Sequence, residues 1–285
     1  MHPRVLEAEP ERAAARPFRP PASLRSSSPI VDEIRTAELL GGSRSSQVWR
    51  AVDATGRTIA LKALQAAWQR QPGAVELLRR EHALLSELRH EHIVAVFGLV
   101  EFRGAPALAM EYLGGGDLVS LAGGHPRTWI GAVRDLLAAL MHVHAHGYAH
   151  RDLKARNVLF DEHNRVRLAD FASAARFGVP QPLGGTTAAY RPVGFVQEQV
   201  GPGDDVFAFA ALLYELMCGR LPFGPNPGGF GAPEVLPVQP GWESEPAMRA
   251  LVELVRLTLA GDGSKGAGSL SRFAAVIESV VAGYL

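Results

Sequence analysis

The apolar residues of this chain change their spacing near Gly116, and this change limits the folds that the chain can adopt. Before Gly116 they occur in short alternating runs, typical of β-strands, with glycine turns between the runs. After Gly116 they recur at the spacing of amphipathic helices. The pattern therefore predicts an α+β fold with two lobes, a small sheet-rich lobe followed by a larger, mainly helical one.

The first lobe is expected to contain a small antiparallel sheet and one helix. Strand patterns occupy residues 34–42, 46–56, 57–64, 92–102 and 105–113. The helix is expected over residues 75–89, where leucines recur at helical spacing: Leu77, Leu78, Leu84, Leu85 and Leu88. A thin connector over residues 111–116 then leads to the second lobe, and ligands favour clefts between two such lobes.

The second lobe is expected to be built from helices. Helical patterns occupy residues 129–146, 204–217, 246–260 and 270–282. The segment 204–217 is apolar almost all round, which predicts a helix buried in the middle of the lobe.

Composition excludes several classes of protein. With 285 residues, of which 47% are hydrophobic, the chain can bury a large core. Lys plus Arg and Asp plus Glu both number 29, so no partner of strong opposite charge is indicated, neither nucleic acid nor an anionic membrane. No run approaches the roughly 18 apolar residues of a membrane span, and the N-terminus has no apolar signal core. Cys218 is the single cysteine, which suits a reducing, cytoplasmic location.

The chain divides into a tail and one domain. Residues 1–30 are rich in Pro, Arg, Ala and Ser without strand or helix periodicity, and we expect a flexible tail. Residues 31–285 are expected to form the domain, with the first lobe over 31–113 and the second over 114–285.

Lys62 and Glu81 occupy positions where charge is unexpected. Lys62 shares one face of a predicted strand with Ala60, and Glu81 lies within the apolar stripe of the predicted helix. An unpaired buried charge costs several kcal/mol, so the two positions predict an ion pair. The alternative is a lysine that extends to solvent and a glutamate at the edge of the stripe.

The segment HRDLKARNVLF, residues 150–160, places a carboxylate, an ammonium group and an amide in one short loop: Asp152, Lys154 and Asn157. A second carboxylate, Asp170, follows the next predicted strand. Such groups can accept a hydroxyl proton, neutralise a phosphate and bind a metal ion, as phosphoryl transfer requires. Carboxylate and amide oxygens suit Mg²⁺.

These motifs occur in a characteristic order. The chain contains LGGSRSSQV, IALK, Glu81, HIV, MEYLGGGDL, HRDLKARN, DFA, GTTAAYRP and DDVFAFAALLYEL. From about Ile34 onward it resembles the eukaryotic-type (Hanks-type) serine/threonine protein kinase family. The HRDLK loop, with lysine two positions after the aspartate, resembles serine/threonine rather than tyrosine kinases.

The resemblance implies roles for the residues that transfer the phosphate. Asp152 would be the catalytic base, and Lys154 would steady the transferred phosphate. Lys62 would hold the α- and β-phosphates of ATP, oriented by Glu81. The expected metal ligands, for Mg²⁺ or alternatively Mn²⁺, are Asn157 and Asp170.

The resemblance also implies an adenosine site. Backbone groups of Glu111 and Leu113 would meet the adenine, Met110 would be the gatekeeper and Asp117 would reach the ribose. The remaining nucleotide-binding positions would be Leu40, Gly41, Val48, Ala60 and Leu159. Asp205 would brace the catalytic loop from the buried helix.

The chain departs from the family pattern in the phosphate loop and after the second carboxylate. Ser43, Ser46 and Ala172 stand where glycine is usual. Glycine allows positive φ, so serine is expected to cost about 1 kcal/mol at such a position and to weaken ATP binding.

Three further departures concern the second lobe. The segment 191–193 reads Arg-Pro-Val and lacks the glutamate of the family, and the turn over 261–269 lacks its arginine partner. Residues 223–241 form a Gly/Pro-rich segment where the family has a docking helix.

Three functions therefore remain open. The first is an active kinase that phosphorylates protein serine or threonine. The second is a pseudokinase, a scaffold or nucleotide-gated module, and the third is a kinase of small molecules, against which the HRDLK and GTTAAYRP segments argue. The expected partners are a nucleotide and a protein substrate, and the oligomeric state does not follow from the sequence.

The segment after Asp170 is the expected place of regulation. Arg151 is a candidate ligand for a phosphate on that segment, and Ser173, Thr186 and Thr187 are candidate phosphorylation sites. For Thr186 a structural role near Asp152 is expected instead.

Overall fold

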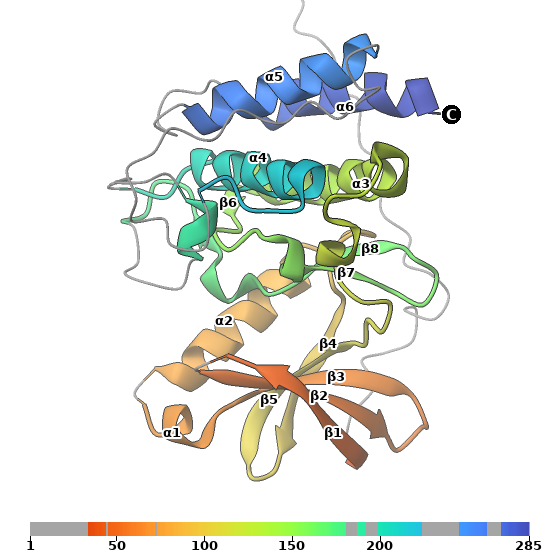
Figure 1. Ribbon diagram of the computed structural model, residues 1–285. Coiled ribbons are helices and arrows are strands. Elements are labelled where there is room, and N and C mark those ends of the chain that lie inside the picture. The colour runs from red at the N-terminus through yellow and green to blue at the C-terminus, as the bar shows by residue number, and fades with distance from the viewer. Residues whose placement is uncertain are drawn as a thin grey trace, which may run out of the picture.

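The small lobe is a five-stranded antiparallel sheet with the strand order β1-β2-β3-β5-β4 (Figure 1). The computed structural model describes residues 34–43, 45–71, 73–180, 187–191, 199–223, 245–260 and 269–284. The strands are β1 (Ile34–Gly42), β2 (Ser46–Asp53), β3 (Thr58–Leu64), β4 (Val96–Phe102) and β5 (Ala105–Glu111). All five predicted strands are present, but β2 ends at Asp53 rather than Gly56, β4 begins at Val96 rather than His92, and β5 ends at Glu111 rather than Leu113. In β3 the register places Lys62 between Val48 of β2 and Leu108 of β5, at the centre of the sheet.

Two helices accompany this sheet, where one was predicted. The short α1 (Ala66–Gln69) precedes α2 (Ala74–Glu87), and α2 packs against β4, β5 and the segment after Asp170. The buried face of α2 is narrower than predicted. Leu78, Glu81 and Leu85 are buried, but the side chain of Leu77 is 51% exposed, because it lies about 100° around the helix from Leu78.

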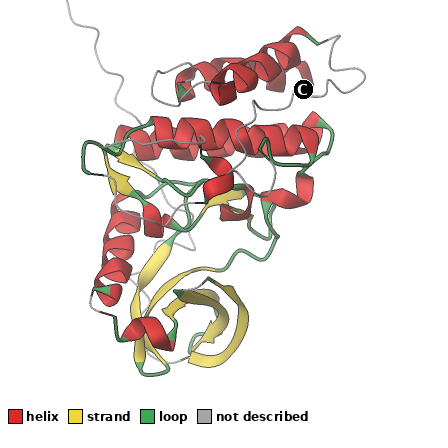
Figure 2. Ribbon diagram, turned by 60° about the vertical axis from the view of Figure 1, so that its left-hand side comes forward, coloured by secondary structure: helices red, strands yellow, loops and turns green. Residues whose placement is uncertain are grey.

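The large lobe is mainly helical, as predicted. Its long helices are α3 (Pro126–Ala145), α4 (Gly203–Cys218), α5 (Pro246–Ala260) and α6 (Leu270–Tyr284). Helices α3 and α4 lie next to the small elements that face the small lobe, and α5 and α6 cover their far side (Figures 1 and 2). Nearly every residue of α4 from Asp205 to Met217 is buried, which confirms the prediction of a central helix.

The elements between the lobes are short. They are η2 (Leu118–Leu121), β6 (Tyr148–Ala149), η3 (Ala155–Asn157), β7 (Val158–Phe160), β8 (Val166–Leu168), η4 (Phe171–Ser173), β9 (Ala175–Arg176) and η5 (Ala188–Tyr190). Strand β7 pairs with β8, and β6 pairs with β9. The loop that begins at His150 directly follows β6, and the segment that begins at Asp170 lies between β8 and β9, so these two small strand pairs position both.

Helix boundaries differ slightly from those predicted. Helix α3 begins at Pro126 rather than Trp129, because proline suits a first helical position and the side chain of His125 accepts a hydrogen bond from the N–H of Arg127. Helix α4 ends at Cys218, where Gly219 adopts the left-handed conformation.

Several predictions concern segments outside the described residues. These are the tail over 1–30, Thr186, Pro192 and Val193, most of the Gly/Pro-rich segment 223–241, and the turn over 261–269 apart from Ser269. Within the part of the chain that the structure describes, no helix is both long and apolar enough to cross a membrane.

Candidate active site

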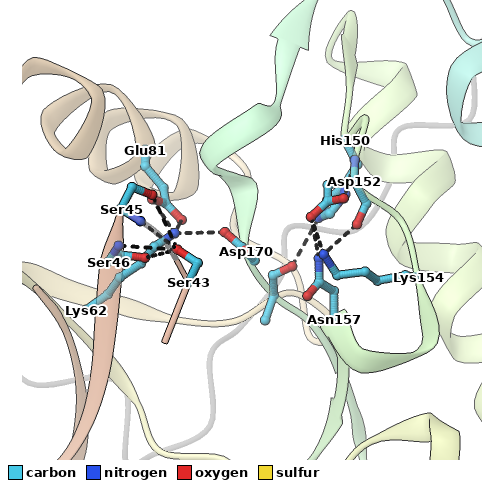
Figure 3. A network of polar contacts seen from close by, with 11 residues as sticks. Ser43, Ser45, Ser46, Lys62, Glu81, His150, Asp152, Lys154, Asn157 and Asp170 are labelled. Atoms are coloured by element: carbon cyan, nitrogen blue, oxygen red, sulfur yellow. Dashed lines mark hydrogen bonds and ion pairs between the residues drawn. The ribbon is translucent and has the colours of Figure 1, made fainter. Parts of the chain in front are cut away.

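Lys62, Glu81 and Asp170 come together from three elements (Figure 3). The Nζ atom of Lys62 in β3 lies 2.8 Å from both carboxylate oxygens of Glu81 in α2. It also lies 2.8 Å from Oδ1 of Asp170, which follows β8. The predicted ion pair is therefore present, and the alternative of a solvent-directed lysine is wrong.

The position of Lys62 keeps it charged. The residue is 7% exposed and Glu81 is 5% exposed. Burial acts to lower the pKa of Lys62, but the negative charges of Glu81 and Asp170 outweigh it, so the pKa is raised. Burial acts to raise the pKa of Asp170, but the nearby ammonium of Lys62 holds it below its ordinary value. The site thus holds one cation between two anions, with the Asp170 side chain 43% exposed.

Asp152, Lys154 and Asn157 form a second group, seen opposite Asp170 in Figure 3. Nζ of Lys154 donates to Oδ2 of Asp152 at 2.6 Å. Nδ2 of Asn157 donates to the carbonyl oxygen of Asp152 at 2.8 Å and to its Oδ2 at 3.2 Å. The loop therefore holds the Asp152 carboxylate in one orientation.

Thr187 completes this second group. Its Oγ1 donates to Oδ1 of Asp152 at 2.7 Å, its N–H donates to the same atom at 3.0 Å, and Nζ of Lys154 donates to Oγ1 at 3.0 Å. A structural role near Asp152 was predicted for Thr186, which lies outside the described residues. Its neighbour Thr187, predicted only as a candidate phosphorylation site, contacts Asp152.

Asp205 connects this loop to the buried helix α4. Its two carboxylate oxygens accept hydrogen bonds from the backbone N–H groups of His150 and Arg151, each at 2.8 Å. Nε2 of His144 in α3 lies 2.8 Å from Oδ2 of Asp205. The bracing contact predicted for Asp205 is present, whereas the contribution of His144 was not predicted.

The loop and the strand end have unusual backbone conformations. The non-glycine residues with positive φ in the described part of the chain are Arg103, Arg151, Asn164 and Asp170. Arg151 (φ 67°) directly precedes Asp152 of the second group, and Asp170 (φ 63°) belongs to the first group. Such conformations persist only where surrounding contacts hold them, and they concentrate at functional sites.

The same observation corrects the expected cost of the serines and of Ala172. Neither Ser43 nor Ser46 has positive φ, and neither does Ala172. The expected penalty of about 1 kcal/mol for replacing glycine therefore does not apply at these positions.

The serines instead bond to one another. Oγ of Ser43 accepts hydrogen bonds from the N–H groups of Ser45, at 3.3 Å, and Ser46, at 3.2 Å, and lies 3.1 Å from Oγ of Ser46. Gln65, directly after β3, donates from its backbone N–H to the carbonyl oxygen of Ser45 and from its side chain to that of Ser43. The turn between β1 and β2 is thus closed by its own side chains.

The residues expected around adenosine lie on the strands and on the connector. Met110 pairs with Ala60 across the sheet, and Leu159 of β7 forms an isolated bridge with Asp117. Leu113 packs against the main core, whereas Leu40 is 49% exposed on β1.

Three other residues were expected to bind the nucleotide, and the structure shows the surroundings of each. Asp117, expected at the ribose, uses Oδ1 to cap η2 by accepting from the N–H of Val119 at 3.1 Å. Val48 pairs with Lys62 in the sheet, and a Cβ added at Gly41 would meet no atom within 4 Å.

The side chain of Glu111 has partners of its own. Its Oε1 accepts from the N–H of Ala95 at 2.8 Å and from Nε of Arg167 at 3.1 Å. The prediction for Glu111 concerned its backbone, and the sequence offered no signal for this side-chain contact.

The expected metal ligands fit a divalent ion such as Mg²⁺ in chemistry. Asn157 is held through its Nδ2, so its amide oxygen could serve as a metal ligand. Asp170 supplies a carboxylate. Mg²⁺ is usually held by one or two such oxygens together with substrate phosphates. Among the described residues no group of three or more His, Cys, Asp or Glu side chains could hold a metal by itself.

Comparison with known proteins gives consistent matches. Residues 34–229 match the family described as the protein kinase domain. CBL-interacting protein kinase 16 of Oryza sativa subsp. japonica is 30% identical over 244 residues, which cover 79% of this chain and 53% of that protein. NUAK family SNF1-like kinase 2 of Rattus norvegicus is 29% identical over 194 residues, covering 65% of this chain and 31% of that protein. The chain spans about half the length of these curated relatives, or less.

Proposed function

The chain belongs to the protein kinase family, and from this membership we propose that it is an ATP-dependent serine/threonine protein kinase. It would transfer the γ-phosphate of ATP to hydroxyl groups of a protein substrate. The observation that carries the proposal is the pair of charged groups described above, with Lys62 bound to both Glu81 and Asp170 and with Asp152 held beside Lys154. The names of the relatives, all kinases, support it.

Each charged group has one chemical task in this proposal. The Asp152 carboxylate accepts the proton of the substrate hydroxyl, and Lys154, 2.6 Å from it, offsets the negative charge that develops on the transferred phosphate. Lys62 contacts the phosphates that stay behind, oriented by Glu81. ATP with its divalent ion, Mg²⁺ or alternatively Mn²⁺, supplies the phosphoryl group and further charge neutralisation, with Asn157 and Asp170 as ligands.

The local geometry supports active transfer over the pseudokinase alternative. All the side chains assigned to the chemistry are present. The substitutions that favoured a pseudokinase, Ser43, Ser46 and Ala172, carry no positive φ and therefore no backbone strain. Val193 lies outside the described residues, so its effect is left to experiment.

Partners and location remain as predicted from the sequence. We propose a protein substrate and a nucleotide as partners, without nucleic acid or membrane, on the basis of the balanced charge. A cytoplasmic location, a tail over residues 1–30 and a domain over residues 31–285 are likewise proposals.

The test is a transfer assay with purified chain, labelled ATP, Mg²⁺ and a generic protein acceptor. We expect Asp152→Asn and Lys62→Met each to lower transfer by about 100-fold or more, because each removes a group that acts in the transition state. Asp135→Asn, which neutralises a carboxylate of α3 outside the site, is the matched control and should keep wild-type activity. Analysis of the phosphorylated amino acids should give phosphoserine and phosphothreonine.

Wild-type transfer no greater than that of the two site variants, with either Mg²⁺ or Mn²⁺, would contradict the enzyme proposal. A thermal shift with ATP would then indicate a nucleotide-binding pseudokinase, and its absence would remove nucleotide binding as well.

A further inference from the structure

Glu111 and Arg167 form a largely buried ion pair between the end of β5, where the connector begins, and β8. Nε of Arg167 in β8 lies 3.1 Å from Oε1 of Glu111, at the end of β5. The Arg167 side chain is 7% exposed and that of Glu111 is 16% exposed. Nη2 of Arg167 also reaches Oδ2 of Asp161, at 3.5 Å. One guanidinium group therefore contacts two carboxylates that are separated by about fifty residues in the sequence.

This ion pair joins three backbone segments. Besides Arg167, Oε1 of Glu111 accepts a hydrogen bond from the N–H of Ala95, at 2.8 Å, in the loop between α2 and β4. That loop is itself attached to β8, since the N–H of Leu168 donates to the carbonyl oxygen of His92 at 2.8 Å and the N–H of Val94 donates to that of Leu168 at 3.0 Å. The Glu111 side chain thus adds contacts to Ala95 and Arg167 where the loop before β4, the end of β5 and β8 meet.

The pair has a strong energetic reason to stay formed. Without Arg167, the largely buried Glu111 carboxylate would lose its cation and keep the N–H of Ala95 as a partner, which is destabilising. The planar guanidinium can contact two carboxylates at fixed angles, whereas an ammonium group cannot reproduce that geometry. Arg167 is therefore suited to fixing a distance between the two lobes and not only to balancing charge.

We propose that Arg167 is a positioning residue for the nucleotide. By holding the Glu111 carboxylate, it fixes the connector backbone, which would meet the adenine, relative to β8, which ends just before Asp170. The adenine end and the metal end of the site are thereby held at a set separation. This inference rests on the proposed function, because it assumes that a nucleotide occupies the site.

The test compares Arg167→Met with Arg165→Met by calorimetric titration of adenosine and of ATP with Mg²⁺. Arg165 is the matched control, because it donates to the same Asp161 carboxylate at 2.7 Å, with a half-exposed side chain. We expect Arg167→Met to bind adenosine about fivefold more weakly, the equivalent of roughly one lost hydrogen bond. The affinity of Arg167→Met for ATP should fall by the same factor, since the phosphate contacts are unchanged. Arg165→Met should bind both ligands with wild-type affinity.

Two further measurements separate positioning from general destabilisation. Val280→Ala removes a buried side chain of α6, far from the connector, and should lower Tm without changing adenosine affinity. In the background of Glu111→Gln, Arg167→Met should have little additional effect on adenosine affinity, because Arg167 acts through Glu111. If Arg167→Met does not fold, Arg167→Lys takes its place, with an expected loss of about threefold because its single ammonium keeps only part of the contact.

The outcomes are distinct. Equal adenosine affinities in the Arg167 and Arg165 variants, or additive effects of the Arg167 and Glu111 substitutions, would overturn the role of Arg167 while leaving the proposed function intact. A wild-type chain that binds neither ligand would overturn the proposed function and this inference with it.

Discussion

The hydroxyl group of Ser43 occupies backbone N–H groups of its own loop that could otherwise bind an anion. Successive backbone N–H groups in a turn form a concave site for anions. Here the N–H groups of Ser45 and Ser46 already donate to Oγ of Ser43. A nucleotide phosphate that approached these N–H groups would first have to displace that hydroxyl, so the serine acts through its hydrogen bonds and not through backbone strain.

We therefore predict that Ser43→Ala binds ATP about threefold more tightly than the wild type, because the two N–H groups are released. Adenosine, which has no phosphate, should bind unchanged. Ser43→Gly should behave like Ser43→Ala, since φ at this position does not require glycine. Calorimetric titration measures both ligands.

Ser45→Ala is the control for this prediction. Among the described residues its hydroxyl contacts Oγ of Ser43, at 3.3 Å, and no N–H group, so its removal should leave ATP affinity unchanged. A gain in Ser43→Gly without a gain in Ser43→Ala would show that backbone freedom matters after all.

At the scale of elements, histidines join the loop after α2 to the end of α3. The ring of His90 lies 4.8 Å from that of His142 and 5.6 Å from that of His92, and the rings of His142 and His146 are 4.3 Å apart. Burial, followed by the neighbouring His142, His92 and Arg167, lowers the pKa of His90 to about 4. The neutral ring of His90 thus packs as an aromatic group against His142 at this junction.

This packing predicts a loss of stability in mild acid. The ordinary pKa of histidine is 6.5, so between pH 6.5 and about 4 the unfolded chain binds a proton at His90 that the folded chain does not. The free energy of unfolding should fall as the pH falls through this window. His90→Phe, which keeps an aromatic ring without a titrating group, should reduce this slope in denaturant titrations at several pH values.

His163→Gln is the matched control, because the side chain of His163 is 66% exposed. The free energy of unfolding of His163→Gln should depend on pH as that of the wild type does. Equal slopes for the wild type and His90→Phe between pH 6.5 and 4 would contradict the assignment.

At the scale of the whole molecule, Asp205 connects the core of the large lobe to the chemistry at its surface. Helix α4 is buried among α3, α5 and the small elements, and its Asp205 has no exposed surface. Its three contacts hold the loop that carries Asp152 at the edge of a rigid helical layer. Burial acts to raise the pKa of Asp205, but the hydrogen bond and charge of His144, the charge of His150 and the backbone N–H of Arg151 together outweigh it, so the pKa is lowered and the group stays charged.

We predict that Asp205→Asn lowers the free energy of unfolding by about 3 kcal/mol, because an amide nitrogen would face backbone donors in a buried position. Phosphate transfer should fall by more than about tenfold as the loop loses its support. ATP affinity should change little, since the adenine contacts lie elsewhere. Glu253→Gln, which replaces an exposed carboxylate of α5, is the control. It should leave the free energy of unfolding, phosphate transfer and ATP affinity unchanged. Unchanged transfer by a folded Asp205→Asn would contradict the bracing role.

Much of the fold and of the candidate site was predictable because it depends on local patterns. Alternation gave the five strands, and apolar spacing gave the long helices. Lys62 and Glu81 were predicted as a pair because two charges at apolar positions require each other. Asp152, Asn157 and Asp170 were found because the chemistry needs those groups in fixed order along the chain.

The sequence by itself therefore determined the lobes, their elements and the identity of the charged groups, since these follow from periodicity and from the cost of burying charge. Only the tertiary structure decided which neighbour each group meets. Thr187 contacts Asp152, and the Ser43 hydroxyl accepts hydrogen bonds from N–H groups of its own turn. Arg167 looks like any alternating polar residue of a short strand, yet it is buried against Glu111. Contacts of this kind depend on how separate elements pack, and no spacing along one chain records that packing.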